Sequence, residues 1–340
     1  MATTAVRYRF EGYDESADGP NVVVDGSPNA GTVLTLTHWP GQAQPPGTTV
    51  DTSAEMAFAH LDDPVDHAPA EVVTNNHFDQ DGTVGLFALV EPETALASRS
   101  LLVDVAHAGD FGTYRDRRAA RASMILHGFA DPARSPCADR LTGDWAADAA
   151  ALYRAALDEL PTIIGEPERY RRLWAEEDES LSASEEAIAS GRVAVAEDAD
   201  LDLAVIRLDG GEPARSGHRF GYESSGPLHP MAVHNTTTCT RLLLVHVDRY
   251  LYVDRYETWV QLRSRTPPSR VDLRPLADEL SAAESQAGGG ATWTAGPPSA
   301  LTPELTHDGG SALAVGVVEA AIRRHLSTAP VAWDPYRPKT

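Results

Sequence analysis

The segment that decides the fold is Ala70-Glu-Val-Val-Thr-Asn-Asn-His77-Phe-Asp79-Gln-Asp81-Gly82-Thr-Val-Gly-Leu-Phe-Ala-Leu-Val90. Its first part is a short β-branched run that predicts a strand, and its last part is an apolar run that predicts a helix. On an extended chain, alternate side chains point in the same direction. We therefore expect His77, Asp79 and Asp81 to converge, and one imidazole with two carboxylates suits a divalent cation.

Two other interpretations of this segment were weighed against a metal site. The first is an acidic strand-to-helix turn in which Asp81 caps the helix and His77 only packs, and the spacing alone does not exclude it. The second is a calcium-binding loop. Counting from Asp79, Val84 stands where that loop requires glycine and Val90 where it requires a bidentate glutamate, so the calcium loop is excluded.

The composition limits the classes of function. The chain has 340 residues, enough for two domains, and its formal charge of 28 minus 50, or −22, disfavours long nucleic acids and anionic membranes. Its two cysteines, Cys137 and Cys239, form no disulfide framework or cysteine zinc site. The single lysine, Lys339, is next to the last residue, which argues against P-loop and pyridoxal-phosphate chemistry. With no signal peptide or apolar membrane span in view, we expect a cytoplasmic protein.

Strand-like and helix-like segments alternate in the first part of the chain, which predicts an α/β layer with a mostly parallel sheet and flanking helices. We expect a metal-binding domain over residues 1–143, a charged helical connector over 144–191 and a smaller α+β domain over 192–340. The predicted strands are 21–25, 32–38, 71–74, 192–195, 201–208, 241–247 and 259–264, and the predicted helices are 53–61, 83–90, 95–108, 117–129, 273–284 and 316–326. In parallel sheets, ligands bind beyond the carboxyl ends of the strands, where Asp25, His38 and His77 fall.

Taken with its flanks, the His77-Phe-Asp79-Gln-Asp81-Gly82 segment resembles the first signature of the DHH-family phosphoesterases. Asn21-Val-Val-Val-Asp25-Gly is similar to the second, a strand that ends in a metal-binding Asp. Leu36-Thr37-His38-Trp39-Pro40 and the following Thr52-Ser53-Ala54-Glu55 resemble the third, in which only the middle position of the Asp-His-His triplet is kept. The first signature follows the other two here, so the motif order is permuted.

The fourth family signature, an Asp-Thr-Gly turn before an aromatic residue and a helix, is matched loosely by Gly109-Asp110-Phe111-Gly112. Asp110 is the last candidate ligand, with capping of the next helix as the equally weighted alternative. Asp104 and His107 are spaced as further ligands on a helix, but exposed helix surface is the favoured interpretation.

The C-terminal half resembles the DHH-associated substrate-binding domain. The matching segments are Glu257-Thr-Trp-Val-Gln-Leu-Arg263-Ser264-Arg265, Val271-Asp272-Leu273 and Gly288-Gly289-Gly290. The histidine that follows the glycines in the family is replaced here by Ala291. The resemblance implies that Arg263, Ser264, Arg265 and the glycine loop bind the substrate. His234 is a further candidate contact, although a loop around it and His229 whose threonines bond to their own backbone is the favoured interpretation.

The resemblance implies a two-domain, metal-dependent phosphoesterase that hydrolyses a short oligonucleotide, cyclic dinucleotide, nucleotide or polyphosphate. The metal ligands would be Asp25, His38, His77, Asp79, Asp81 and Asp110, of which His38, His77, Asp79 and Asp81 would also be catalytic. Oxygen-rich ligation favours Mn²⁺, with Mg²⁺ as the alternative cation. The partner expected is a small phosphorylated molecule, without long nucleic acid or membrane, and a homodimer stays open. The rival hypotheses are a degenerate nucleotide- or metal-binding protein of the same fold and an unrelated metal-dependent hydrolase.

Overall fold

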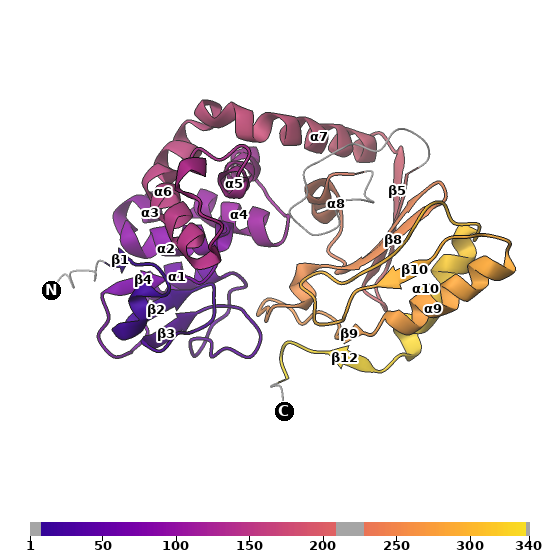
Figure 1. Ribbon diagram of the computed structural model, residues 1–340, viewed down its shortest axis with the longest axis horizontal. Helices are drawn as coiled ribbons and strands as arrows, with labels where there is room; N and C mark the ends of the chain where they lie inside the picture. The colour runs from indigo at the N-terminus through magenta and orange to yellow at the C-terminus, as the bar shows by residue number, and fades with distance from the viewer. Residues whose placement is uncertain (1–7, 209–227, 338–340) are drawn as a thin grey trace. The chain divides into compact units, whose positions relative to one another are not determined.

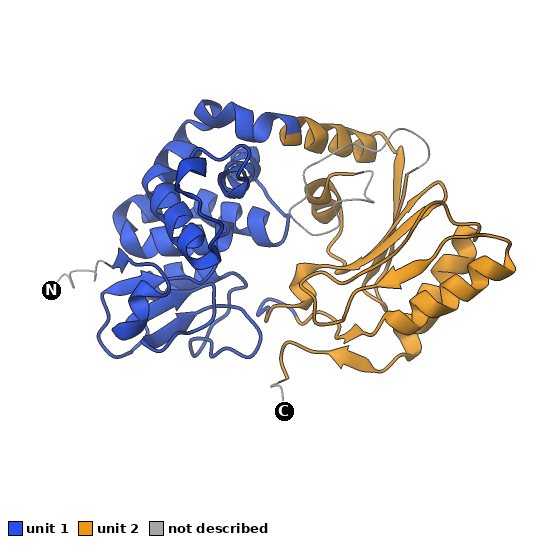
Figure 2. Ribbon diagram, in the orientation of Figure 1, with its two compact units in different colours: residues 1–176, 262–265 blue, residues 177–261, 266–340 orange. Residues whose placement is uncertain are grey.

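The computed structural model describes residues 8–208 and 228–337, which divide into two compact units (Figures 1 and 2). Unit 1 comprises residues 1–176 and 262–265, and unit 2 comprises residues 177–261 and 266–340. The division falls inside helix α7 (Arg171–Ala189). Helix α6 (Trp145–Gly165), which we expected in a separate connector, belongs to unit 1 and packs on α5 (Arg117–Ala130).

Unit 1 contains the predicted parallel sheet, so the α/β fold class is confirmed. Its strands are β1 (Arg9–Phe10), β2 (Asn21–Val24), β3 (Thr32–Leu36) and β4 (Val72–Thr74). They are ordered β1-β4-β2-β3, and every neighbouring pair is parallel. All of β2 is buried, as expected for a β-branched strand with helices against a parallel sheet. Because the strands are parallel, Asp25, His38 and His77 follow the same edge of the sheet.

The helices of unit 1 follow the predicted pattern with one difference. They are α1 (Ser53–Asp62), α2 (Gln80–Val90), α3 (Pro92–Ala97), α4 (Arg99–Asp110), α5 and α6, with 3₁₀ turns at Glu15–Asp18, Ala138–Arg140 and Pro167–Tyr170. The helix predicted over 95–108 is interrupted at Ser98, which separates α3 from α4. Thr52 and Glu55 form a capping box at the start of α1, which fixes that helix terminus.

Two glycines allow α2 to approach the sheet and its neighbours closely. A Cβ atom at Gly85 would lie 2.5 Å from Cγ1 of Val24, the residue before Asp25. At Gly82 it would lie 2.3 Å from the Tyr153 hydroxyl. The glycines of the Asp81-Gly82 segment therefore serve close packing, and this packing brings the start of α2 against the end of β2.

Unit 2 is a mixed α/β unit around a six-stranded sheet of order β10-β11-β8-β7-β6-β5, in which only β6 and β7 pair in parallel. Its strands are β5 (Val193–Asp198), β6 (Leu203–Leu208), β7 (Arg241–His246), β8 (Arg249–Asp254), β10 (Trp293–Ala295) and β11 (Glu304–His307); β9 (Arg270–Val271) and β12 (Val331–Trp333) form a separate pair. Its helices are α8 (Pro230–Thr236), α9 (Arg274–Gln286) and α10 (Val315–Thr328).

The strand predicted over residues 259–264 is wrong. The chain there leaves a 3₁₀ turn at Tyr256–Thr258 and continues without regular structure. Strand β8, which lies directly before that turn and pairs with β7, was not predicted. The short strands β1, β9, β10, β11 and β12 were not predicted either. Within the described ranges, no helix has the length and apolar character needed to cross a membrane.

Candidate metal centre

The six residues predicted as metal ligands converge at the carboxyl edge of the parallel sheet in unit 1. They form two groups, within each of which one potential ligand atom per residue lies within 4.8 Å of the others. The first group is Asp25, His38, Asp81 and Asp110, and the second is Asp25, His77 and Asp79. Because Asp25 belongs to both groups, its two carboxylate oxygens can face two different cations. The chain thus offers donor sets for a pair of neighbouring ions.

Asp25 is positioned by an unusual backbone conformation. Its φ angle is 52°, in the left-handed region that Asp tolerates better than most residues. The carboxylate is buried, and Oδ1 accepts a hydrogen bond of 2.8 Å from the Ser53 hydroxyl. Oδ2 is also buried and accepts no hydrogen bond from the described part of the chain. A buried carboxylate oxygen without a hydrogen bond lowers the stability of the fold unless a cation compensates its charge.

His38 is fixed in the tautomer that a metal ligand needs. Its Nδ1 lies 2.7 Å from the Asp51 carbonyl oxygen, which can only accept, so Nδ1 carries the proton and donates it. The lone pair of Nε2 then points toward carboxylates, 3.5 Å from Asp25 Oδ1 and 3.3 Å from Asp110 Oδ2. Burial lowers the pKa of His38 to about 4, which keeps the imidazole neutral. Three electron-pair donors that face one another favour a cation between them.

His77 and Asp79 form the second group with Asp25. His77 Nε2 lies 3.5 Å from Asp25 Oδ2 and 3.3 Å from Asp79 Oδ2. The ring of Trp39 lies 5.0 Å from that of His77, between centroids, and bounds this side of the group.

The reason given for the convergence of His77, Asp79 and Asp81 is wrong, although the convergence itself is observed. β4 ends at Thr74, and the three residues do not lie on an extended strand. Asp79 is the N-cap of α2, where its Oδ1 accepts from the Gly82 amide at 2.8 Å. Asp81 lies inside the first turn, so it is not the cap that the alternative interpretation assumed.

The buried carboxylate of Asp81 faces the start of α1. Its Oδ2 accepts from the Ser53 amide at 2.7 Å and its Oδ1 from the Ala54 amide at 2.8 Å. Two unsatisfied amides at a helix N-terminus are natural partners for a carboxylate. Ser53 thus contacts both Asp81 and Asp25, a role that its place at a predicted helix start does not reveal.

Asp110 does not cap the next helix, and Asp104 does not lie on exposed helix surface. Asp110 ends α4, and the N-cap of α5 is Asp116, whose carboxylate accepts from the Arg118 amide. Capping by Asp110 is therefore wrong. Asp104, expected on exposed surface, is buried and accepts from the amides of Arg115 and Asp116 at 2.7–3.0 Å. It shapes the turn between α4 and α5.

The carboxyl groups of the centre strongly perturb one another. Burial, with the charges of Asp79 and Asp81, raises the pKa of Asp25 well above its ordinary value. Burial and the charge of Asp79 likewise raise the pKa of Asp81 to about 7, against the opposing effect of the α1 amides. Burial would also raise the pKa of Asp79, but His77 and the Gly82 amide lower it overall. Divalent cations would relieve this crowding of negative charge.

The substrate-binding residues predicted from the C-terminal half lie in different surroundings. Arg263 and Ser264 belong to the short segment assigned to unit 1, together with Arg265, and their backbone amides donate to Asp51 Oδ1 at 2.7 and 2.8 Å. The Arg263 side chain donates to Gln44. Asp51 thus holds this segment through its side chain while its carbonyl orients His38.

The glycine loop of unit 2 is largely engaged in helix termination. The Gly288 amide donates to the Ser285 carbonyl and the Gly289 amide to the Glu284 carbonyl, at 3.3 and 2.9 Å. These two amides are therefore not the phosphate donors that the resemblance implied. Gly290 follows them on the loop, and His234 is buried within α8.

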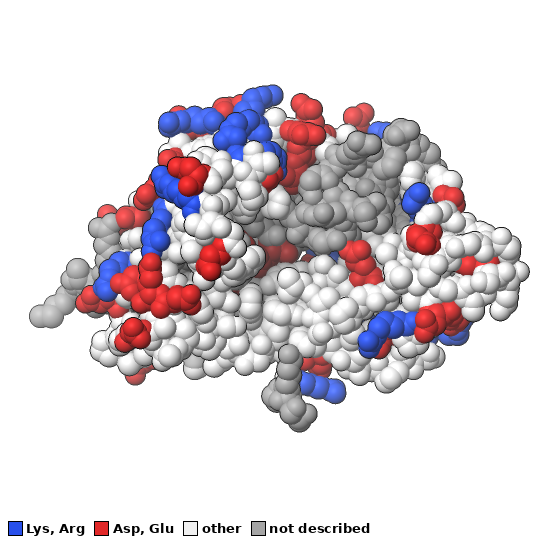
Figure 3. All heavy atoms as spheres, in the orientation of Figure 1, with Lys and Arg blue, Asp and Glu red and all other residues white. Residues whose placement is uncertain are grey.

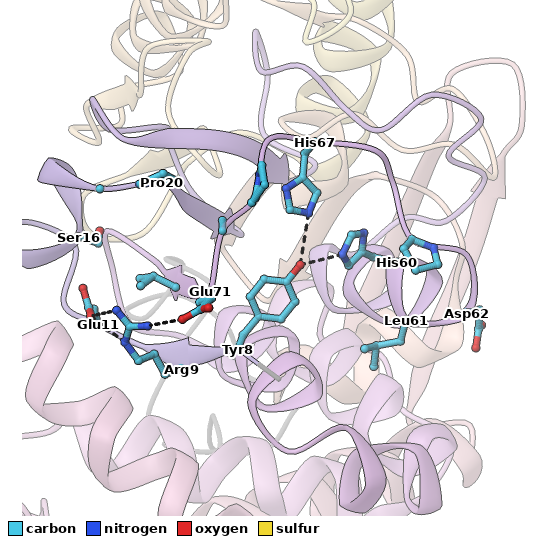
Figure 4. A pocket seen from close by; sticks show the side chains of 15 residues that line it. Tyr8, Arg9, Glu11, Ser16, Pro20, His60, Leu61, Asp62, His67 and Glu71 are labelled. Carbon is cyan, nitrogen blue, oxygen red and sulfur yellow. Dashed lines mark hydrogen bonds and ion pairs between the residues drawn. The ribbon is translucent and has the colours of Figure 1, made fainter. Parts of the chain in front are cut away.

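A cavity of ≈1040 Å³ lies at the opposite, amino-terminal edge of the parallel sheet (Figure 4). Its hydrogen-bonded centre is the Tyr8 hydroxyl, 3.1 Å from His60 Nε2 and 3.3 Å from His67 Nε2. His60 Nδ1 accepts from the Val65 amide, so its Nε2 carries the proton and donates to Tyr8. That protonated nitrogen is unsuited to bind a metal, and the cavity contains none of the six residues of the candidate metal centre.

Charged side chains of both signs lie on the surface of the described chain. On the face shown in Figure 3, arginine side chains lie among acidic side chains, and the described chain carries many exposed ion pairs such as Arg154 with Glu15 and Arg324 with Glu279.

The fold and the site together define an α/β protein with a candidate dinuclear metal centre at the carboxyl edge of a parallel sheet. The chain belongs to the family described as "Family of unknown function (DUF6687)", whose model matches residues 6–337. Searches of curated proteins and of solved structures found no match.

Proposed function

We propose that this protein is a metal-dependent phosphoesterase that hydrolyses a small phosphorylated substrate at the centre around Asp25. The single observation that carries the proposal is the pair of donor groups that share the Asp25 carboxylate. Two cations held a few ångströms apart can lower the pKa of water and neutralise charge on phosphoryl oxygens. The proposal agrees with the resemblance to DHH-family phosphoesterases.

The donor types favour manganese or magnesium over zinc. The two groups contain four different carboxylates and two imidazoles, without cysteine. Such an oxygen-rich set suits a hard cation, with Mn²⁺ accommodating the imidazoles better than Mg²⁺. The carboxylates also supply local negative charge that the cations must offset before an anionic substrate can approach. The acidic composition of the chain is then compatible with a phosphorylated substrate.

The chain's own residues would hold and orient this arrangement. The Asp51 carbonyl fixes the His38 tautomer, and the Ser53 hydroxyl orients Asp25. The α1 amides hold Asp81, and the Gly82 amide holds Asp79. In each case the contacting group is a backbone atom or a hydroxyl, and it is not itself one of the candidate metal ligands. Orientation by such outer contacts is typical of functional metal sites.

The most informative variant is Asp79→Asn, which removes one carboxylate and keeps a good helix N-cap. Asp79→Ala would remove the cap as well and cost about 1 kcal/mol of stability for a reason unrelated to metal. We expect Asp79→Asn to abolish Mn²⁺-dependent hydrolysis of bis(4-nitrophenyl) phosphate and 4-nitrophenyl phosphate. Circular dichroism should show an unchanged fold.

Asp144→Asn is the matched control, because Asp144 is likewise a helix N-cap, at the start of α6, and belongs to neither donor group. It should retain wild-type turnover. Equal activity of wild type and Asp79→Asn would contradict the proposal. Tight Mn²⁺ binding to the wild type without turnover of aryl phosphates, nucleotides or polyphosphate would instead favour the non-catalytic metal-binding alternative.

A further inference from the structure

We propose that His107, held by Glu55, donates a proton to the leaving oxygen of the substrate. This inference rests on the proposed phosphoesterase function and adds a residue that the metal centre does not include. It concerns a carboxylate–imidazole pair whose histidine, His107, the sequence pattern places on exposed helix surface.

Glu55 and His107 form a half-buried ion pair. His107 Nε2 lies 3.3 Å from Glu55 Oε2, and the two side chains are 29% and 23% exposed. The same Glu55 oxygen accepts from the amides of Asp51 and Thr52 at 3.2 and 3.0 Å, so the carboxylate is held in place by the start of α1. The His107 ring packs edge-on against Phe111, with centroids 5.5 Å apart. Both members of the pair therefore have fixed orientations.

The second ring nitrogen of His107 makes no contact with Glu55. Nε2 faces Glu55, whereas Nδ1 has no hydrogen-bond partner among residues 8–208 and 228–337. A carboxylate that accepts from one ring nitrogen and leaves the other to exchange a proton is the arrangement by which histidine acids and bases are oriented in enzymes. The pair favours the charged forms, since Glu55 raises the pKa of His107 against the effect of burial.

Both members of the pair also lie next to the metal centre along their own elements. Ser53 and Ala54, which bind Asp81, directly precede Glu55 on α1. On α4, His107 precedes Asp110 by three residues, and residues at this spacing share one face of a helix. Helix α1 therefore carries both the amides that bind Asp81 and Glu55. Helix α4 likewise carries both Asp110 and His107 within one turn.

The chemical step balances as a simple hydrolysis. The oxygen of water forms a bond to phosphorus, and the bond from phosphorus to the leaving oxygen breaks with its electron pair on that oxygen. The leaving oxygen takes the Nδ1 proton of His107. The proton lost by the attacking water passes to solvent, from which the imidazole regains one. The net reaction consumes one water molecule.

The test compares His107→Gln with wild type on two diesters of similar shape, diphenyl phosphate and bis(4-nitrophenyl) phosphate, in MnCl₂. Phenol, with a pKa of about 10 like tyrosine, needs a proton to leave, whereas 4-nitrophenol is far more acidic. We expect the loss of kcat on diphenyl phosphate to be about 10²-fold or more, and at least tenfold larger than the loss on the nitrophenyl ester. Glu55→Gln should show the same selectivity in weaker form.

Two further readouts separate proton donation from structure or metal binding. Isothermal titration calorimetry should give His107→Gln the Mn²⁺ affinity of the wild type, and both proteins should unfold at similar temperatures. Equal losses on the two diesters, or weakened Mn²⁺ binding, would overturn the inference while leaving the phosphoesterase proposal in place. A wild type that hydrolyses neither diester nor the corresponding monoesters would count against the proposed function itself, and this inference would fall with it.

Discussion

The variant Asp25→Asn should make the metal-free protein more stable while it removes the response to metal. Asn tolerates the left-handed conformation at this position, and its side-chain oxygen can still accept from Ser53. The change removes a buried negative charge that stands beside those of Asp79 and Asp81. Stability and metal binding should therefore respond in opposite directions.

The size of the effect follows from the raised pKa of Asp25. Unfolded Asp has a pKa of about 3.9, so below that pH both states are protonated and the group costs nothing. As the pH rises, the unfolded chain ionises first, and wild-type stability falls. At pH 7 the cost cannot exceed about three pKa units at about 1.4 kcal/mol each, or roughly 4 kcal/mol. Because Asn still buries a polar group, we expect a gain of about 1–3 kcal/mol at pH 7 that vanishes near pH 4.

The assay is differential scanning calorimetry with and without MnCl₂, with hydrogen–deuterium exchange of the β2 amides identifying the transition of unit 1. At about 100 times Kd, Mn²⁺ should stabilise the wild type by about 2.7 kcal/mol per site, which corresponds to roughly 5–10 °C in Tm. Asp25→Asn should show little of this increase. Asp66→Asn, the same change at an exposed position, should behave like wild type within about 0.5 kcal/mol. A metal-free Asp25→Asn protein less stable than wild type would refute the reasoning.

Three further predictions concern packing, buried charge and pH. Gly82→Ala should destabilise unit 1 by about 1–3 kcal/mol in urea, since its Cβ would overlap neighbouring side chains, whereas Gly165→Ala has open space around it and should cost nothing; equal effects would contradict the packing argument. Arg270→Met should destabilise unit 2 by about 3–5 kcal/mol, because this fully buried guanidinium donates to the carbonyls of a loop and lies near buried acidic groups. Arg274 forms an exposed ion pair and serves as the control, and a loss of stability no larger than that of Arg274→Met would argue against this role. Burial lowers the pKa of His60, so the stability that the neutral imidazole contributes is present above about pH 6.5 and is lost as the pH falls. The unfolding free energy of unit 1 should therefore decline from pH 7 to 5. His60→Gln should flatten that slope, and a steeper slope would contradict the prediction.

The six candidate ligands could be found from sequence because strand ends are readable. Short β-branched runs predicted β2, β3 and β4, and parallel strands bring their carboxyl ends to one edge. Asp25, His38 and His77 follow those ends within three residues. The geometry that unites them with Asp79 and Asp81 was misjudged, because alternation along a strand was assumed where the chain already turns into α2.

The supporting residues were harder to predict because their roles depend on contacts between distant segments. Ser53 binds Asp81 across 28 positions in the chain, and the Asp51 carbonyl that orients His38 carries no signal in its side chain. Glu55 and His107 meet only when α1 packs beside α4. Such partners follow from tertiary packing, which periodicity along one element does not encode.

In the C-terminal half, the sequence pattern predicted one helix correctly and one strand wrongly. The helix predicted from Leu273 is α9, and the glycines do follow it. The predicted strand before Arg263 is absent, because Arg263 and Ser264 bond through their amides to Asp51 instead of to a neighbouring strand. Local composition indicated a turn or loop but could not specify which carbonyl each glycine amide would meet.

The most direct test of the dinuclear centre is anomalous X-ray scattering from crystals of the protein grown with Mn²⁺. We predict two manganese peaks about 3.5–4 Å apart, on either side of the Asp25 carboxylate, with His38 bound to one ion and His77 to the other. A single peak away from Asp25, or no anomalous density among these residues at saturating Mn²⁺, would contradict the account.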